Sequence, residues 1–158
     1  MKKAFTAIAG LALATAVAGT AIGQSGDEAA MKAVKARQDT MMLFAFNLGT
    51  LGGMAKGAIP YDADTASAAA KNLSLLSQLN MTAYWVEGTS TEQLGDKTEA
   101  LPAIWSDMAG FEDKHMALTK AAADMEAAAG QGLDQLKGAV GAVGGSCGGC
   151  HKQFRVDN

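Results

Sequence analysis

Apolar residues recur at steps of three and four through most of this chain, and this spacing constrains its fold more than any other feature. Prolines are rare, since the whole sequence has only Pro60 and Pro102, and runs of β-branched or aromatic residues are scarce. An apolar stripe of this period is typical of an amphipathic α-helix. In the last segment the stripe consists of Leu133, Leu136, Val140, Val143, Cys147, Cys150 and Phe154. The chain is therefore predicted to be all-α.

Breaks in the pattern divide the chain into four helices. The first is expected from about Gly26 to Met54, with a stripe through Met31, Val34, Gln38, Met41, Ala45 and Leu48. The second follows an N-cap at Asp62 or Asp64 and is expected to end near Tyr84 and Trp85. After a polar connection the third begins at Pro102, and Gly-Gln-Gly at 130–132 separates it from the fourth. These elements predict an antiparallel four-helix bundle.

The first 23 residues resemble a secretory signal peptide. A basic start at Lys2 and Lys3 precedes a short run of apolar and small residues, and Ala21-Ile22-Gly23 fits a small-x-small cleavage site. We expect cleavage after Gly23, which leaves residues 24–158 as a single domain with enough chain for one core. The mature protein is thus expected to be exported to an oxidising compartment, the periplasm.

The charge of the chain excludes one class of partner. Losing Lys2 and Lys3 changes the formal net charge from −3 to −5, and the basic residues form no stripe. Nucleic acid is therefore not an expected ligand. After the leader, no second apolar stretch is long enough to cross a bilayer, so we expect no membrane span in the mature form.

The sequence Cys147-Gly-Gly-Cys150-His151 contains both cysteines and one of the two histidines of the chain. On a helix, thiols three residues apart project from one side, and His151 flanks that side. This geometry suits covalent haem attachment, in which two thiols add to the two vinyl groups and the imidazole binds the iron. The pattern therefore predicts one covalently bound haem c per chain, with His151 as the metal ligand.

Three other uses of this motif fit less well. A redox dithiol is expected at a helix start near a strand pattern, which this chain lacks. A zinc site needs a fourth ligand, and only His115 remains, which we expect to be a rim residue without a role at the iron. A disulfide closed over two residues constrains the unfolded chain little.

The last predicted helix is also unusually rich in glycine, with Gly138, Gly141, Gly144, Gly145, Gly148 and Gly149. Each glycine costs about 1 kcal/mol of helix stability relative to alanine. One interpretation is an irregular helix. The other is that a flat macrocycle lies against the backbone and leaves no room for side chains.

The complete pattern resembles the class II c-type cytochromes, and within them the cytochrome c′ family. The segments that carry the resemblance are "VKARQDTM", "GAIPYDAD", "IWSDMAGF" and "SCGGCHKQFR". The resemblance implies thioether bonds at Cys147 and Cys150 and iron ligation by His151. It also implies that Arg37 and Gln38 lie near the haem propionates, and that Arg155 lies near the exposed proximal face.

The role of Met41 distinguishes the two coordination states of the iron that the resemblance allows. Met41 matches the position that covers the distal face of the iron, where cytochromes c′ keep a five-coordinate iron. In the related low-spin cytochrome c-556 group, a methionine at this position is the sixth ligand. The Arg37-Gln38 pair favours the five-coordinate form, and both alternatives remain open.

Function follows from this resemblance as a set of expectations. We expect one-electron transfer with redox partner proteins in the periplasm, and an iron able to bind small neutral gases such as NO or CO. A second hypothesis is NO binding or scavenging as the main role. No general base or activated nucleophile is recognisable, so we do not expect an enzyme. The family also implies a homodimer, in which the first two helices form the contact.

Overall fold

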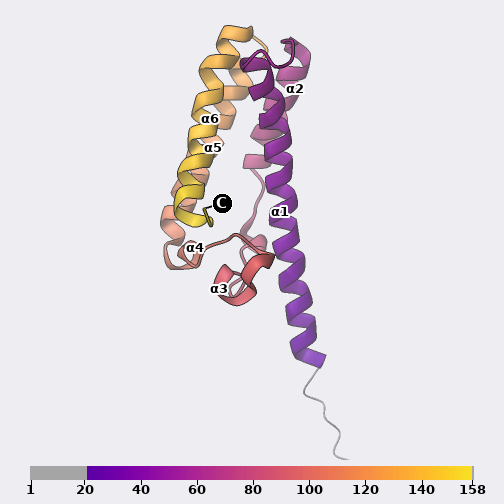
Figure 1. The fold of residues 1–158 in the computed structure, drawn as a ribbon, viewed down its shortest axis with the longest axis vertical. Coiled ribbons are helices and arrows are strands. Elements are labelled where there is room, and N and C mark those ends of the chain that lie inside the picture. Colours follow the sequence, from indigo (N-terminus) through magenta and orange to yellow (C-terminus); the bar gives the residue numbers. More distant parts are fainter. Residues whose placement is uncertain (1–20, 158) are drawn as a thin grey trace, which may run out of the picture.

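The computed structural model describes the backbone of residues 21–157 and the side chains of residues 26–157. Four long helices lie side by side (Figure 1): α1 (Ala21–Ala55), α2 (Ala63–Ser77), α5 (Met108–Ala128) and α6 (Leu133–Phe154). Both α1 and α5 pack against α2 and α6. The expected antiparallel four-helix bundle is confirmed. Most of the predicted leader, residues 1–23, lies outside the described residues.

Two short connections meet at one end of the bundle. Asp62 is the N-cap of α2 and accepts a hydrogen bond from the Thr65 amide, as one of the two sequence alternatives predicted. The neighbouring Tyr61 hydroxyl donates to the Ala129 carbonyl and accepts from the Gly132 amide. Gly132 has a φ of 123°, which favours glycine, and α6 begins directly after it. Tyr61 therefore joins the α1–α2 connection to the α5–α6 connection.

At the other end, α2 stops earlier than the apolar spacing predicted. The Ser77 hydroxyl donates to the Ser74 carbonyl, and the Asn80 side chain accepts from the Thr82 amide. Such local bonds compete with helical ones and favour turns. The predicted end near Tyr84 and Trp85 was therefore wrong.

The chain between α2 and α5 crosses the open end of the bundle, and we call residues 78–107 the crossing segment. It contains four short helical turns, namely η1 (Thr82–Tyr84), α3 (Thr91–Leu94), η2 (Gly95–Lys97) and α4 (Ala103–Ser106). The third predicted helix is thereby divided, because Asp107 leaves helical geometry (φ −134°, ψ 58°) and caps α5 through the Gly110 amide.

The buried apolar residues form two clusters. The larger cluster fills the closed end of the bundle and includes Phe44, Leu51, Leu73, Ala122, Met125, Leu136 and Val143. The smaller cluster lies beside the crossing segment and consists of Ala100, Ile104 and Phe154. Between Val143 of the larger cluster and Phe154 of the smaller one, α6 has no buried residue, and we call this level of the bundle the layer between the two clusters.

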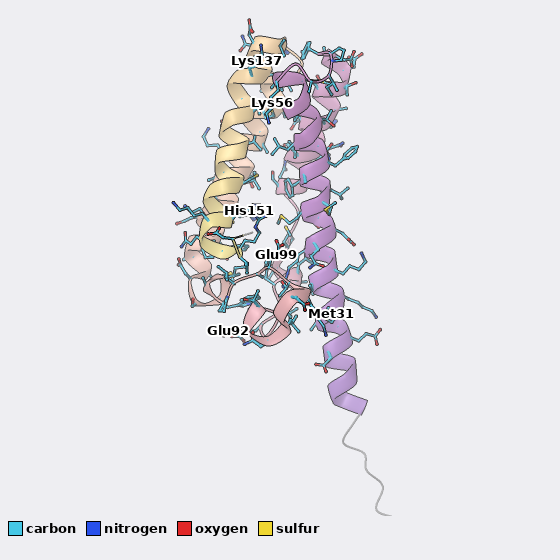
Figure 2. All side chains as sticks on the ribbon, viewed as in Figure 1. Met31, Lys56, Glu92, Glu99, Lys137 and His151 are labelled. Atoms are coloured by element: carbon cyan, nitrogen blue, oxygen red, sulfur yellow. The ribbon has the colours of Figure 1, made fainter. Side chains whose placement is uncertain are left out.

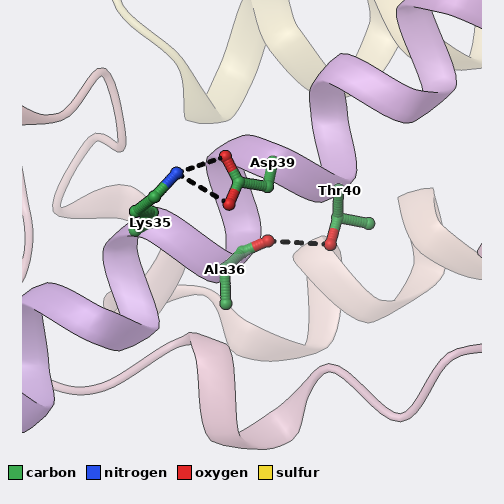
Figure 3. A network of polar contacts seen from close by, with 4 residues as sticks. All are labelled: Lys35, Ala36, Asp39 and Thr40. Atoms are coloured by element: carbon green, nitrogen blue, oxygen red, sulfur yellow. Dashed lines mark hydrogen bonds and ion pairs between the residues drawn. The ribbon is translucent and has the colours of Figure 1, made fainter.

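The buried face of α1 differs from the predicted one. Arg37 and Phe44 are buried, whereas Gln38 and Ala45 of the predicted stripe are exposed. Charged side chains lie on the outer surface of the same helix before this point, and Figure 3 shows the exposed Lys35 amine bound to both Asp39 carboxylate oxygens at 2.8 and 2.9 Å. A period between three and four residues fits either phase over a few turns, and packing selects the one observed.

Candidate functional site

The two cysteines lie near the C-terminal end of α6 and project toward the layer between the two clusters. Cys147 packs against the larger cluster and Cys150 against the smaller one. Both side chains are half-buried, and both are free thiols in the described part of the chain. Because the two positions are three residues apart on a regular helix, one face of α6 presents both sulfur atoms.

Burial changes the acidity of all three groups in the motif. It raises the pKa of the Cys147 and Cys150 thiols, and the charge of Cys147 raises that of Cys150 further. Catalytic dithiols need a lowered thiol pKa, so this environment does not favour redox-active cysteines. Burial also lowers the pKa of His151, and the Arg155 charge acts in the same direction. A neutral imidazole is the form that binds a metal.

Met41 lies on α1 next to the buried face of that helix. The buried positions are Ala33, Val34, Arg37, Thr40, Phe44, Asn47, Leu51 and Met54. Thr40 is the buried residue at this level and is 7% exposed, whereas Met41 is 38% exposed. The chain's own atoms therefore cover the Met41 thioether only in part.

Two enclosed nitrogen atoms lack a hydrogen-bond partner among the described residues, namely His115 Nε2 and Arg155 Nε. An enclosed polar atom without a partner costs about 1–3 kcal/mol, which indicates that something else completes the site. His115 was expected to be a rim residue without a role at the iron, and its side chain is half-buried on α5. Two thiols, an imidazole, a partly exposed thioether and orphaned nitrogens fit a haem group.

Arg37 is the most highly connected polar side chain of the site. One terminal nitrogen donates to the Tyr84 carbonyl (3.2 Å) and the Thr89 hydroxyl (2.8 Å). The other donates to the Thr89 carbonyl (2.7 Å) and the Thr98 hydroxyl (2.8 Å). Burial lowers the pKa of the guanidinium, whose acceptors here are all uncharged. Arg37 thus fixes the crossing segment to α1.

Aromatic rings complete the environment of the Arg37 guanidinium. Its central carbon lies 5.0 Å from the Trp85 ring centroid and 5.9 Å from that of Trp105. The Trp105 indole in turn donates to the Trp85 carbonyl. Cation–π contacts of this kind strengthen when water is excluded. The sequence pattern did not predict this arrangement. Two tryptophans in one connecting segment are a feature that could have indicated an aromatic site for a buried arginine.

One short stretch connects the remaining candidate residues, and we call residues 97–101 the strap. The Gln38 side chain donates to the Lys97 carbonyl on one side of it. On the other side Ala100 pairs with Arg155 in an isolated antiparallel bridge. The structure therefore brings Arg37, Gln38 and Arg155 to one region, one helical turn from Met41 and from His151.

The glycines of α6 have open space beside them. At Gly138, Gly141, Gly144, Gly145, Gly148 and Gly149 an added Cβ would meet no heavy atom of the described chain within 4 Å. The helix is nevertheless regular through these positions, so the interpretation as an irregular helix was wrong. No packing against the chain itself requires these glycines.

Within residues 21–157 no group of three or more His, Cys, Asp or Glu side chains is arranged to hold a metal ion. The roles of the seven site residues named from the sequence remain predictions.

A helical bundle whose last helix carries C-x-x-C-H between two buried clusters is typical of a c-type haem protein. The family model described as Cytochrome C′ matches residues 32–155. The chain belongs to the cytochrome c′ family.

Similar proteins agree in sequence and in fold. Cytochrome c′ of Cereibacter sphaeroides is 44% identical over 123 residues, which cover 78% of this chain and 82% of the relative. The solved cytochrome c′ from "Rhodobacter Spheriodes" superposes with a TM-score of 0.79 at 43% identity, covering 82% of this chain and 98% of that one. A nitric oxide complex of a mutant cytochrome c prime from Alcaligenes xylosoxidans gives a TM-score of 0.71 at 36% identity, covering 82% and 97%.

Proposed function

We propose that this protein carries single electrons in the periplasm through a covalently bound haem c whose iron is five-coordinate. The group would be held by thioether bonds to Cys147 and Cys150 and by His151, and would supply the ferric–ferrous couple. The observation that carries this proposal is the position of both thiols at the layer between the two clusters. Redox partner proteins, and no substrate, are the implied partners.

The distal side is proposed to admit NO or CO. Met41 lies on α1, which packs against α6, and its thioether is only partly covered by the chain. An apolar side chain next to an open coordination position excludes anions but admits small neutral molecules. The solved nitric oxide complex of the Alcaligenes xylosoxidans relative supports the same capacity here.

Absorption spectra of the purified ferric and ferrous protein test this proposal. We expect high-spin spectra in both oxidation states, CO binding to the ferrous form, and no change of spin state in Met41→Ala. Met42→Ala is the matched control, because Met42 is 69% exposed on the outside of the same helix. A methionine-to-iron charge-transfer band that disappears only in Met41→Ala would show the cytochrome c-556-like alternative instead. A colourless protein would overturn the haem itself.

Export and cleavage belong to the same proposal. The basic start, apolar run and Ala21-Ile22-Gly23 support a leader that ends at Gly23. No helix in the described range is long and apolar enough to cross a membrane. The mass of protein isolated from the periplasm should correspond to a chain that begins at Gln24 and carries one haem. A mass that includes residues 1–23 would contradict cleavage.

A homodimer through α1 and α2 is proposed from the apolar surface of these helices. Phe46, Met42 and Leu43 on α1 are 74%, 69% and 52% exposed, and Leu75 on α2 is 55% exposed. The Asn72 amide donates to the Asn47 side-chain oxygen, which holds the two helices in register beside this surface. Exposed apolar residues gathered in this way typically mark an interface.

A further inference from the structure

The strap is fixed to the end of α6 by its main chain. The Val156 amide donates to the Glu99 carbonyl, and the Leu101 amide donates to the Phe154 carbonyl, each at 3.0 Å. With the bridge between Ala100 and Arg155, these bonds form a short antiparallel pairing. These main-chain bonds hold the backbone of Glu99 beside the helical turn that carries His151. They do not depend on the Glu99 side chain.

The Glu99 side chain lies near the basic side chain at the end of α6, Arg155. Its Oε2 atom lies 3.8 Å from Arg155 Nε, the enclosed nitrogen that has no hydrogen-bond partner. The two side chains are 52% and 42% exposed, so solvent screens the pair and its value for stability is small. Figure 2 shows Glu99 beside the end of α6 that carries His151, whereas Glu92 lies on the outer side of the crossing segment.

Through its position next to Arg155, Glu99 places a negative charge beside the end of α6 that follows His151. A fixed negative charge close to a redox centre stabilises the more positive oxidation state.

We propose that Glu99 is a positioning residue of the proximal face, which holds Arg155 beside His151 and favours the ferric over the ferrous state. This inference rests on the proposed haem function. It adds a residue that lies outside the C-x-x-C-H motif and on a different part of the chain. Glu99 belongs to the strap and not to α6. It therefore acts on the haem site through its contact with Arg155, one helical turn after His151.

Glu99→Gln in the intact holoprotein tests the proposal, because it removes the charge while the main-chain bonds of the strap remain. At a fixed applied potential we expect the ferrous-to-ferric ratio to rise about two- to threefold, the effect of one largely screened charge near the redox centre. The iron–histidine stretching frequency of the ferrous form should change, because Arg155 loses the carboxylate beside it. Thermal unfolding should remain unchanged.

Glu92→Gln is the matched control, since it makes the same charge change on the same crossing segment, away from His151. It should leave the redox ratio and the stretching frequency at wild-type values. Wild-type values in Glu99→Gln, or equal shifts in both variants, would overturn the role of Glu99. Failure of the proposed function would appear differently, as a wild-type protein without haem or with a low-spin iron.

Discussion

Replacing Arg37 with lysine tests how the crossing segment is held in place. The guanidinium makes four hydrogen bonds from two nitrogens to Tyr84, Thr89 and Thr98, and is only 3% exposed. Lysine keeps the charge but has a single nitrogen on a flexible stem, so it cannot reproduce a planar fork. At least two of the four bonds should be lost.

The size of the effect follows from these contacts. A hydrogen bond to a charged group contributes about 1.5–3 kcal/mol, and water entering the site offsets part of the loss. We therefore expect Arg37→Lys to lower the free energy of unfolding by about 2–4 kcal/mol. We expect the crossing segment to open before the whole bundle unfolds, because Arg37 joins this segment to α1 and few other contacts do so.

Two measurements check this expectation. Denaturant unfolding gives the free energy, and limited trypsin digestion reports opening of the crossing segment through cleavage after the exposed Lys97. Lys35→Met is the control, because the Lys35–Asp39 pair is 74% and 59% exposed and should contribute no more than about 1 kcal/mol. If Arg37→Lys unfolds and is cleaved like the wild type, Arg37 does not hold the segment.

Three further predictions concern the ends and the surface of the bundle. Tyr61→Phe removes the hydroxyl that bonds Ala129 and Gly132, and should lower the free energy of unfolding by about 1–3 kcal/mol in the same denaturant assay; an unchanged value would contradict the joining role. The hydrogen bond from Thr65 lowers the pKa of Asp62, so the cap stabilises above the ordinary carboxyl pKa and is lost as the pH falls through the lowered one. Asp62→Ala should therefore melt earlier than the wild type at neutral pH, and the difference should vanish in strong acid. Phe46→Glu should convert a dimer to a monomer in light scattering at unchanged helicity, and a persistent dimer would place the interface elsewhere.

The structure also explains why some sequence predictions were wrong. The buried face of α1 includes Arg37 and Phe44, whereas the spacing had predicted Gln38 and Ala45, which are exposed. Burying an arginine is unfavourable unless acceptors satisfy it, and the acceptors come from Thr89 and Thr98, far along the chain. A local pattern has no information about such partners.

The sequence by itself determined the elements and the motif, since helical periodicity, the cap at Asp62 and the spacing of Cys147, Cys150 and His151 depend on residues within a few turns of one another. Only the tertiary structure decided what surrounds the motif. The end of α2 at Ser77, the strap beside α6 and the position of Glu99 near Arg155 each depend on contacts between segments distant in sequence. Local spacing sets which face of a helix is apolar, but the packing of the whole chain decides what that face meets.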